Sequence, residues 1–596
     1  KFFYKLLLKN IIMPTTSFFT AESRIPISQK KISVAAENGL SYKLGQRINF
    51  VVPSSTGYFM PSETYLRMDV KVQMPVDVAG SMTKLSLDGQ LGANVLIRDI
   101  TIRSGGAQNV LLEEIQNVNV LTALRYDYET NDNIKAKRAL TEGSQFKSVE
   151  NRGTLGAEES LMNNHRSNSF YDHSSATFGN DSYKTCKALI RLPAGIFQND
   201  RVFPLGLTDG LRIEILLEEA PKVFRQLDNV IKDRAITSNC RFHSINGSDT
   251  VGAANNWQSG SGTTTIFFER DNDLLSANSL PFAVGETIGW YDPTNNVDAG
   301  ATADVVITGI DFVAGLSTTM SRVKITFAAT TQTSGAAIGQ GYFAYSKSVT
   351  TWTTPPTASI DDVELLIQQV TMPDGYTATM MDMLKAGGSL NYDFLSYTNY
   401  KTSIQSTDRV ANIRLPIQNS RCKSILCIPT DASVYSAMDS MSGTGTYKVN
   451  DVVHDCGTSG VNNSTRSGLV GIADHLSNYQ FLYDGKLNPS RKVPCDRTSI
   501  NSTKRQGINQ QVLIECEKAL HMANIDPLSF RSFQENFFIA RALSLSDGVY
   551  DGRGKDFSLQ LEYQETTAPT KNKLVHCFVA HLRRIVVSGD NISIQV

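Results

Sequence analysis

The stretch YQFLYDGKLNPSRKVP (residues 479–494) has the pattern of a β-hairpin. Asp484 and Gly485 stand between two segments that contain apolar residues. An Asp-Gly pair in this position is a strong signal for a tight turn, because glycine adopts a positive φ at little steric cost. Pro489 and Pro494 restrict the returning segment. The stretch contains no nucleophile beside a base, no metal-ligand cluster and no phosphate-binding loop, so it points to structure rather than catalysis.

Alternation of apolar and polar residues with a period of two recurs along the chain. It is clearest in LRMDVKVQM (66–74), LRIEILL (211–217) and FSLQLEY (557–563). This period predicts strands that bury one face of an antiparallel sheet. From Leu574 the sequence continues as two further strand-like runs, with Gly589-Asp590 as the turn between them. The sequence therefore predicts an all-β fold.

Two helices are expected among these strands. One begins at Leu111, and the other lies near the C-terminal end. Each helix would place four apolar residues on one face: Leu111, Leu112, Ile115 and Val118 in the first, and Val512, Leu513, Cys516 and Leu520 in the second. Two short helices among many strands favour a β-sandwich with helices in its long loops.

The chain divides into two strand-rich halves, and Gly387-Gly388 is the predicted boundary between them. Two long polar segments without periodicity, at about residues 142–175 and 440–463, interrupt the halves. Loops of this length are uncommon in compact domains and often carry function.

All three tryptophans, Trp257, Trp290 and Trp352, lie in a segment from about residue 238 to 356 that is rich in Thr, Gly, Ala and Ser. The segment separates LRIEILLEE from DDVELLIQQV, two strands that are expected to be neighbours in a sheet. We therefore expect an inserted β domain with a small aromatic core, since clustered tryptophans and β-branched runs indicate burial. The alternative is a long disordered loop.

The composition argues against a nucleic-acid-binding domain, a disordered chain and a disulfide framework. The chain has 57 basic and 58 acidic residues, so it lacks the basic excess of most nucleic-acid-binding domains. A near-neutral protein repels its own copies weakly, which permits dense packing. Hydrophobic residues make up 41% of the chain, enough for real cores. None of the eight cysteines forms a C-x-x-C pair, so free thiols are expected.

The first residues, KFFYKLLLKNII, precede the first methionine, Met13. Lys1, Lys5 and Lys9 would share one helical face and leave the rest apolar. The run is shorter than the roughly 20 apolar residues that span a bilayer. Three interpretations remain: translated sequence upstream of a start at Met13, an arm that lies on a neighbouring subunit, and a helix on a membrane surface.

No catalytic, cofactor-binding or metal site is expected. The sequence has no G-x-S-x-G, H-E-x-x-H or Walker pattern. Gly443-Thr444-Gly445 lacks a third glycine and a preceding strand. His454 and Cys456 have no second pair at zinc spacing. The segment 271–273 (DND) lacks the glycine and the final glutamate of an EF-hand loop.

The order of the strand motifs resembles that of double jelly-roll major capsid proteins of the adenovirus and tailless-phage lineage, and most closely those of virophages and polinton-like viruses. The likeness covers most of residues 40–237 and 360–596. It is carried by INFVVPSSTGYFMPSETYLRMDVKV, FPLGLTDGLRIEILLEEA and DDVELLIQQVTMPDGY in the first half, and by NIRLPIQNSRCKSILCIP, the stretch 479–494, FSLQLEYQE and NISIQV in the second.

The resemblance implies two consecutive eight-stranded jelly rolls with a few short helices in loops. The expected units are an N-terminal arm (1–39), a first jelly roll (40–237 plus 357–387), an inserted β-rich tower (238–356) and a second jelly roll (388–596). In the family, insertions between late strands project outward. The resemblance thus implies that Trp257, Trp290 and Trp352 belong to a tower on the virion exterior.

The function that the resemblance implies is a capsid protein without enzymatic activity or cofactor. Three chains would form a pseudo-hexameric capsomer, and capsomers would tile an icosahedral shell around double-stranded DNA. Expected partners are two further copies, neighbouring capsomers, and penton and minor capsid proteins. No sequence-specific nucleic acid is expected, and membrane contact would involve only the N-terminal arm. The protein would be found in the virion, after assembly in the cytoplasm or nucleus of an infected cell.

Two other functions remain open. A minor capsid or penton protein is one, although a penton normally needs a single jelly roll. A secreted carbohydrate-binding or glycosidase β-sandwich is the other, and the clustered tryptophans favour it because sugar rings stack on aromatic faces. A glycosidase would need two carboxylates about 5–9.5 Å apart.

Overall fold

The structure is a computed structural model of the 596-residue chain. It describes residues 28–73, 82–144, 169–173, 183–226, the strand segments between 242 and 346, and residues 357–432, 453–455, 460–462 and 468–596, with short gaps inside several of these ranges. Lys1–Ile12 and most of the two long polar segments lie outside the described residues.

The first half is a sandwich of two antiparallel sheets. The main strands of one sheet follow the order β1-β20-β4-β9, and those of the other follow β3-β11-β6-β7. The short β2 (Ser41–Lys43) and β10 (Phe203–Pro204) extend the first sheet. The bounds are β1 (Ser28–Ala35), β3 (Arg47–Val52), β4 (Tyr58–Gln73), β6 (Ile97–Ser104), β7 (Leu111–Ile115), β9 (Tyr183–Arg191), β11 (Leu211–Leu217) and β20 (Thr357–Thr371).

The second half repeats this arrangement. Its sheets have the orders β21-β32-β23-β30 and β22-β31-β26-β27, and β33 (Asn591–Gln595) extends the first of them. The bounds are β21 (Ser389–Ile404), β22 (Val410–Leu415), β23 (Cys422–Asp431), β26 (Leu476–Tyr483), β27 (Lys486–Pro494), β30 (Ile539–Ala542), β31 (Phe557–Tyr563) and β32 (Lys573–Ser588).

The winding of the chain identifies both sandwiches. When the eight main strands of each half are numbered in chain order, one sheet reads first-eighth-third-sixth and the other reads second-seventh-fourth-fifth. This is the arrangement of a jelly roll, in which two Greek keys close eight strands into facing sheets. The expected fold class, two consecutive jelly rolls, is therefore confirmed.

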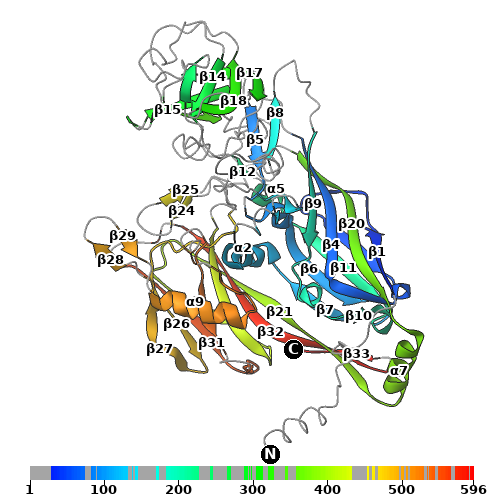
Figure 1. The fold of residues 1–596 in the computed structure, drawn as a ribbon. Helices are drawn as coiled ribbons and strands as arrows, with labels where there is room; N and C mark the ends of the chain where they lie inside the picture. The colour runs from blue at the N-terminus through cyan, green and yellow to red at the C-terminus, as the bar shows by residue number, and fades with distance from the viewer. Residues whose placement is uncertain are drawn as a thin grey trace, which may run out of the picture.

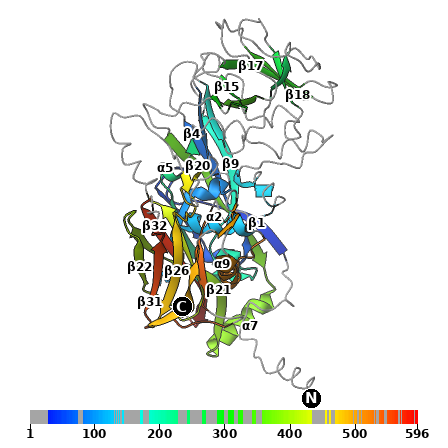
Figure 2. The same cartoon turned by 90° about the vertical axis from the view of Figure 1, so that its left-hand side faces the viewer.

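The two jelly rolls lie side by side, and long connections gather at one end of the molecule (Figures 1 and 2). In the first jelly roll, three separate connections contribute β5 (Met82–Ser86), β8 (Ser169–His173) and β12 (Arg225–Gln226), which pair as one small sheet. In the second, the connections carry the paired strands β24 (Val453–Asp455) and β25 (Gly460–Asn462), and β28 (Thr498–Asn501) and β29 (Arg505–Gly507).

The segment between β11 and β20 contains a seven-stranded sheet beyond this end of the jelly rolls (Figures 1 and 2). Trp290 is fully buried there, with the rings of Phe242 and Phe268 at 5.8 and 6.5 Å. Trp257 and Trp352 lie outside the described residues. The strands are β13 (Phe242–Ile245), β14 (Thr265–Glu269), β15 (Thr287–Asp292), β16 (Val297–Asp298), β17 (Val305–Phe312), β18 (Met320–Phe327) and β19 (Phe343–Ser346).

The hairpin predicted in residues 479–494 is confirmed. It joins β26 to β27, and Tyr483 pairs with Lys486 across the turn. Asp484 and Gly485 have φ values of 51° and 74°. Two successive positive φ angles define the type I′ turn, whose twist matches that of the flanking strands.

The predicted start of the first helix, at Leu111, is wrong. Leu111–Ile115 form β7, which pairs with β6, and the helix α2 runs from Val118 to Glu129. Asn117, with a φ of 52°, separates the two elements. The apolar spacing fits one helix or a strand followed by a helix, and pairing with β6 decides the outcome. The second predicted helix is α9 (Gln510–Met522), which buries Val512, Cys516 and Leu520 as expected.

The linker between the jelly rolls contains a helix that was not predicted, α7 (Asp374–Lys385). It buries Tyr376, Met380 and Leu384, which lie four residues apart on one face. Gly387, with a φ of 86°, follows the helix and leads into β21. A short helix, α5 (Ala220–Val223), follows β11.

The expected boundary of the N-terminal arm at residue 39 is also corrected. Ser28–Ala35 form β1 and pair with β20 over their full length, so the first sheet begins inside the expected arm. β1 was hard to recognise because most of its residues are exposed. None of the helices within the described residues has the length and apolar character needed to cross a bilayer.

Candidate functional site

No group of three His, Cys, Asp or Glu side chains among the described residues could hold a metal ion. The side chain of His454, all of Cys456, and the segments 271–273 and 443–445 lie outside the described residues. The candidate site is the junction between the two jelly rolls, where buried polar side chains form hydrogen bonds from one to the other.

Glu113 of β7 is the centre of this junction and has no exposed surface. Its carboxylate accepts hydrogen bonds from the backbone N–H groups of Gly195 and Ile196, at 2.9 and 3.0 Å, in the connection after β9. It also accepts one from the hydroxyl of Ser396, at 2.7 Å, on β21 of the second jelly roll. Burial raises the pKa of Glu113, and the three hydrogen bonds partly oppose that rise.

Further polar contacts join the same faces of the two jelly rolls. Arg583 of β32 donates to the carbonyl of Leu111 at 3.2 Å, and its charge favours the ionised form of Glu113. Asn199 donates to the carbonyl of Asp393 at 3.0 Å. Phe203 and Tyr392 pack edge to face, with ring centroids 5.1 Å apart. The junction is therefore a packed interior rather than a contact between two surfaces.

Helix α2 extends the junction to the loops of the second jelly roll. The hydroxyl of Tyr128, which is fully buried, donates to the carbonyl of Asn536 at 2.9 Å. The backbone N–H of Leu528 donates to the carbonyl of Tyr128 at 2.8 Å. Asn536 donates in turn to the carboxylate of Asp127 at 2.6 Å. Helix α2 thus fixes a connection of one jelly roll against a connection of the other.

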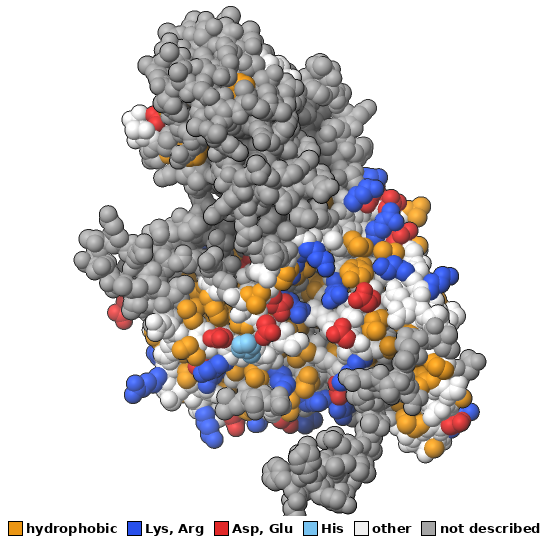
Figure 3. Space-filling model, in the orientation of Figure 1, with side chains coloured by type: hydrophobic (Ala, Val, Ile, Leu, Met, Phe, Trp, Pro, Cys, Tyr) orange, Lys and Arg blue, Asp and Glu red, His pale blue; other side chains and the backbone are white. Residues whose placement is uncertain are grey.

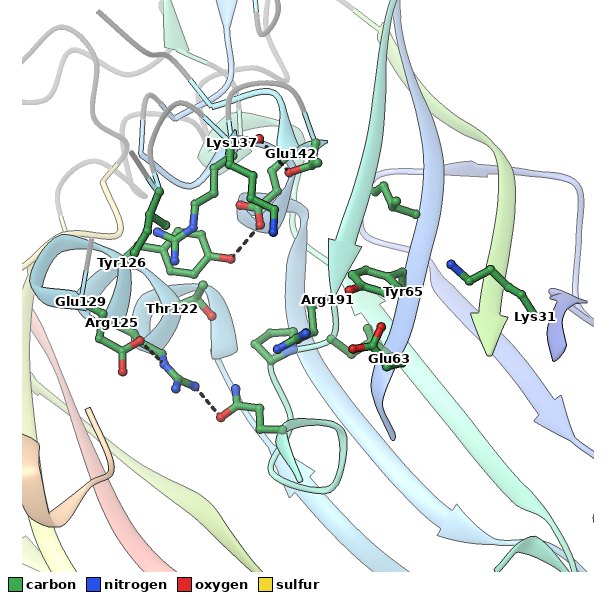
Figure 4. Close-up of a pocket in the computed structure, with 17 residues that line it drawn as sticks. Lys31, Glu63, Tyr65, Thr122, Arg125, Tyr126, Glu129, Lys137, Glu142 and Arg191 are labelled. Atoms are coloured by element: carbon green, nitrogen blue, oxygen red, sulfur yellow. Dashed lines mark hydrogen bonds and ion pairs between the residues drawn. The ribbon is translucent and has the colours of Figure 1, made fainter. Parts of the chain in front are cut away.

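A cavity of about 650 Å³ lies between α2 with its following turn and the outer face of β4 and β9 (Figure 4). Arg125 crosses part of it, bonded to Glu129 at 2.6 Å and to Gln198 in the connection after β9. Basic groups outnumber acidic ones in its lining: Lys31, Arg125, Lys137, Arg138 and Arg191 against Glu63, Glu129 and Glu142. The Arg125 contacts tie α2 to the first jelly roll.

Glu142 lies at the upper rim of this cavity and is nearly buried. It accepts hydrogen bonds from the hydroxyl of Tyr126 at 3.2 Å and from the amide of Asn94 at 3.1 Å. Burial raises the pKa of Glu142 to about 7, although the nearby charge of Arg138 opposes the shift. This carboxyl group therefore titrates near neutral pH.

The visible outer face of the jelly rolls has no large field of one sign. In Figure 3, Lys and Arg side chains alternate with Asp and Glu over both jelly rolls, with hydrophobic side chains between them. The six described cysteines are free thiols, as expected, and five of them are buried. Neither the junction around Glu113 nor the rim at Glu142 was identified from the sequence, because the chain neighbours of a charged residue give no sign of its burial.

The strand order decides the fold. The chain has the double jelly-roll fold. No family model matches the sequence, and no curated protein matches it.

Several solved structures are similar to the chain. The Faustovirus major capsid protein is 8% identical with a TM-score of 0.44, over 94% of this chain and 90% of that one. The PBCV-1 capsid is 9% identical with a TM-score of 0.41, over 96% and 98%. The mavirus major capsid protein is 9% identical with a TM-score of 0.34, over 96% and 93%. These proteins belong to the lineage that the sequence resembles. Because the TM-scores lie below 0.5, the assignment of the fold rests on the strand order alone.

Tight packing at the junction predicts the effect of Gly195→Ala. An added Cβ would lie 1.9 Å from the carbonyl oxygen of Leu395 in the second jelly roll. We expect the free energy of unfolding to fall by about 3 kcal/mol, since backbone on both sides must shift. Gly206→Ala is the matched control, because an added Cβ there meets nothing within 4 Å. Chemical denaturation measures both. Equal stability of the two variants would show that the junction is loose.

The raised pKa of Glu142 predicts that the free energy of unfolding depends on pH. Its pKa is about 7 in the folded protein against an ordinary value of 4.5, so the folded state binds more protons between these values. Its contribution is fully present below pH 4.5 and is lost as the pH rises through 7. Glu142→Gln does not titrate. Its stability relative to the wild type should therefore grow by about 3 kcal/mol between about pH 5 and about pH 8.5. Denaturation at both pH values tests this, and parallel curves would contradict it.

Proposed function

We propose that this chain is a viral major capsid protein that assembles as a trimeric, pseudo-hexameric capsomer. The supporting observation is the pair of jelly rolls with identical strand order, held side by side in one chain by a buried junction. Three such chains around a threefold axis present six similar sandwiches, which gives a nearly hexagonal tile. Fold alone does not establish function, so the proposal rests on this arrangement and on the ordered motifs of the sequence.

The long connections lie at one end of the molecule, which suggests how the capsomer is oriented in the shell. Three connections of the first jelly roll meet in the sheet β12-β5-β8, and the seven-stranded insertion lies beyond them. The opposite end holds α7 and β33 at the C-terminus. We assign the first end to the virion exterior and the second to the shell interior. The sandwich walls between them would contact neighbouring copies, capsomers and minor capsid proteins.

The proposed units follow the observed strands. The first jelly roll comprises residues 40–237 and 357–387 together with β1, the tower comprises 238–356, and the second jelly roll comprises 388–596. Trp290 would stabilise the tower core on the virion exterior. The near-neutral charge fits a shell wall around double-stranded DNA, because a wall that binds DNA directly would need a basic face.

The two alternatives are less well supported. A penton normally needs one jelly roll, and this chain has two. The carbohydrate-binding alternative depended on the clustered tryptophans. Trp290 packs against Phe242 and Phe268 and has no exposed surface, so its ring is not available for stacking on a sugar.

Size-exclusion chromatography with light scattering tests the proposal on two proteins. The full chain should elute as a trimer with about three times the chain mass of 65.5 kDa. A variant in which a short Gly-Ser linker replaces residues 238–356 should also form trimers, because the jelly rolls do not depend on the tower for their cores. A full chain that stays monomeric would contradict the proposed assembly. A variant that fails to fold would show that the insertion belongs to the jelly-roll core.

A further inference from the structure

A lysine and an aspartate face each other inside the second jelly roll. Nζ of Lys573 lies 2.5 Å from Oδ2 of Asp474, and neither side chain has any exposed surface. Lys573 is the first residue of β32 in one sheet, whereas Asp474 lies two residues before β26 in the other sheet. We propose that these side chains form an intramolecular isopeptide bond, made by loss of one water molecule, that covalently joins the two sheets.

The backbone around both residues fixes this approach. Asp474 and the next residue, His475, both have positive φ angles, of 40° and 64°. Such angles are costly for residues other than glycine and persist only where surrounding contacts impose them. The backbone N–H of Lys571 donates to Oδ2 of Asp474 at 3.0 Å, and Nζ of Lys573 donates to the carbonyl of Lys571 at 2.9 Å. The carbonyl of His475 accepts from the N–H of Gln564 at 3.0 Å.

Burial favours the uncharged amine of Lys573 that the reaction needs. The ring of Tyr563 lies 4.6 Å from Nζ of Lys573. Asp431, which is buried, stands opposite Lys573 in the pairing of β23 with β32, and its carboxylate is 3.8 Å from Nζ of Lys571. Burial lowers the pKa of Lys573 even though Asp474 and Asp431 both favour the charged ammonium. A fully buried ion pair is costly, and moving one proton along the existing hydrogen bond converts it to an amine and a carboxylic acid.

The reaction then needs no external reagent. The lone pair of Nζ attacks Cγ of Asp474 and forms the C–N bond. The C–O bond to the protonated Oδ2 breaks, and a proton from the nitrogen joins the departing hydroxyl as water. Fixed contact between amine and carboxyl replaces a bimolecular encounter and strongly accelerates such a step. Burial also keeps solvent water away from the amide that forms.

The bond would lock the end of the jelly roll from which the long connections leave. It would close a loop that contains β26, β27, α9, β30 and β31. This inference concerns the folded chain alone, so it stands or falls independently of the proposed assembly.

Intact-mass spectrometry of the denatured full chain tests the proposal directly. We expect a mass lower than that of the sequence by one water molecule. Proteolytic mapping should yield a branched peptide that joins Lys573 to Asp474, with no tryptic cleavage after Lys573. The pair Lys71 and Asp361 is an internal control, because its Nζ–Oδ2 distance is 2.7 Å but its side chains are 37% and 20% exposed. These two residues should be recovered in separate linear peptides.

Two variants extend the test. Lys573→Met should have the full mass of its own sequence. Asp474→Asn should lose one ammonia molecule instead of water, since the leaving group changes from hydroxyl to amide nitrogen. A wild-type chain of full mass, with Lys573 and Asp474 in separate peptides, would overturn the proposal. So would a loss of water without a branched peptide, which indicates a cyclic imide at an aspartate, or a branched peptide that also links Lys71 to Asp361.

Discussion

The buried carboxyl group of Glu113 holds the two jelly rolls together. A carboxyl group without solvent contact must receive hydrogen bonds from the protein, because an unsatisfied buried polar group is costly. Here the donors come from both jelly rolls, with Gly195 and Ile196 on one side and Ser396 on the other. A shift of one sandwich against the other would remove at least one donor. The carboxyl group therefore fixes the relative position of the two jelly rolls.

This fixed position gives the molecule its two distinct ends. Helix α2 joins connections of both jelly rolls through Tyr128 and Asn536, so the loop-rich end is held as one unit. The small sheet β12-β5-β8 draws three connections of the first jelly roll together beneath the insertion. At the other end, Ser420 binds the C-terminal carbonyl of Val596, and α7 joins the jelly rolls. Such a rigid molecule suits a capsid subunit, because the long connections at one end can differ without a change in the sandwiches that contact neighbouring copies.

The parts that could be predicted from the sequence are those governed by local periodicity. The alternation in residues 211–217 matches the burial pattern of β11, and the Asp484-Gly485 pair forms the expected turn. Two predictions failed at segments whose secondary structure is set by pairing with another strand. The apolar spacing from Leu111 suits a helix, yet β6 draws Leu111–Ile115 into a sheet. β1 has only a short apolar stripe, in which Ile32 and Val34 are partly buried, and it pairs with β20 over its full length.

Buried charges were the least predictable features. Glu113, Glu142 and Lys573 are charged residues whose sequence neighbours give no sign that they lie in the interior. Their burial follows from contacts with residues far away in the chain, such as Ser396 for Glu113 and Asp474 for Lys573. The junction therefore depends on the packing of one jelly roll against the other, and the pair of Lys573 and Asp474 depends on the packing of the two sheets of the second jelly roll.

Electron microscopy of the purified protein tests whether three chains form a pseudo-hexagonal capsomer. Averaged views along the symmetry axis should show a pseudo-hexagonal outline made of six sandwich-sized densities. Views from the side should show three protrusions at one end only. Particles with two densities and no threefold axis, or threefold particles with protrusions at both ends, would contradict the account.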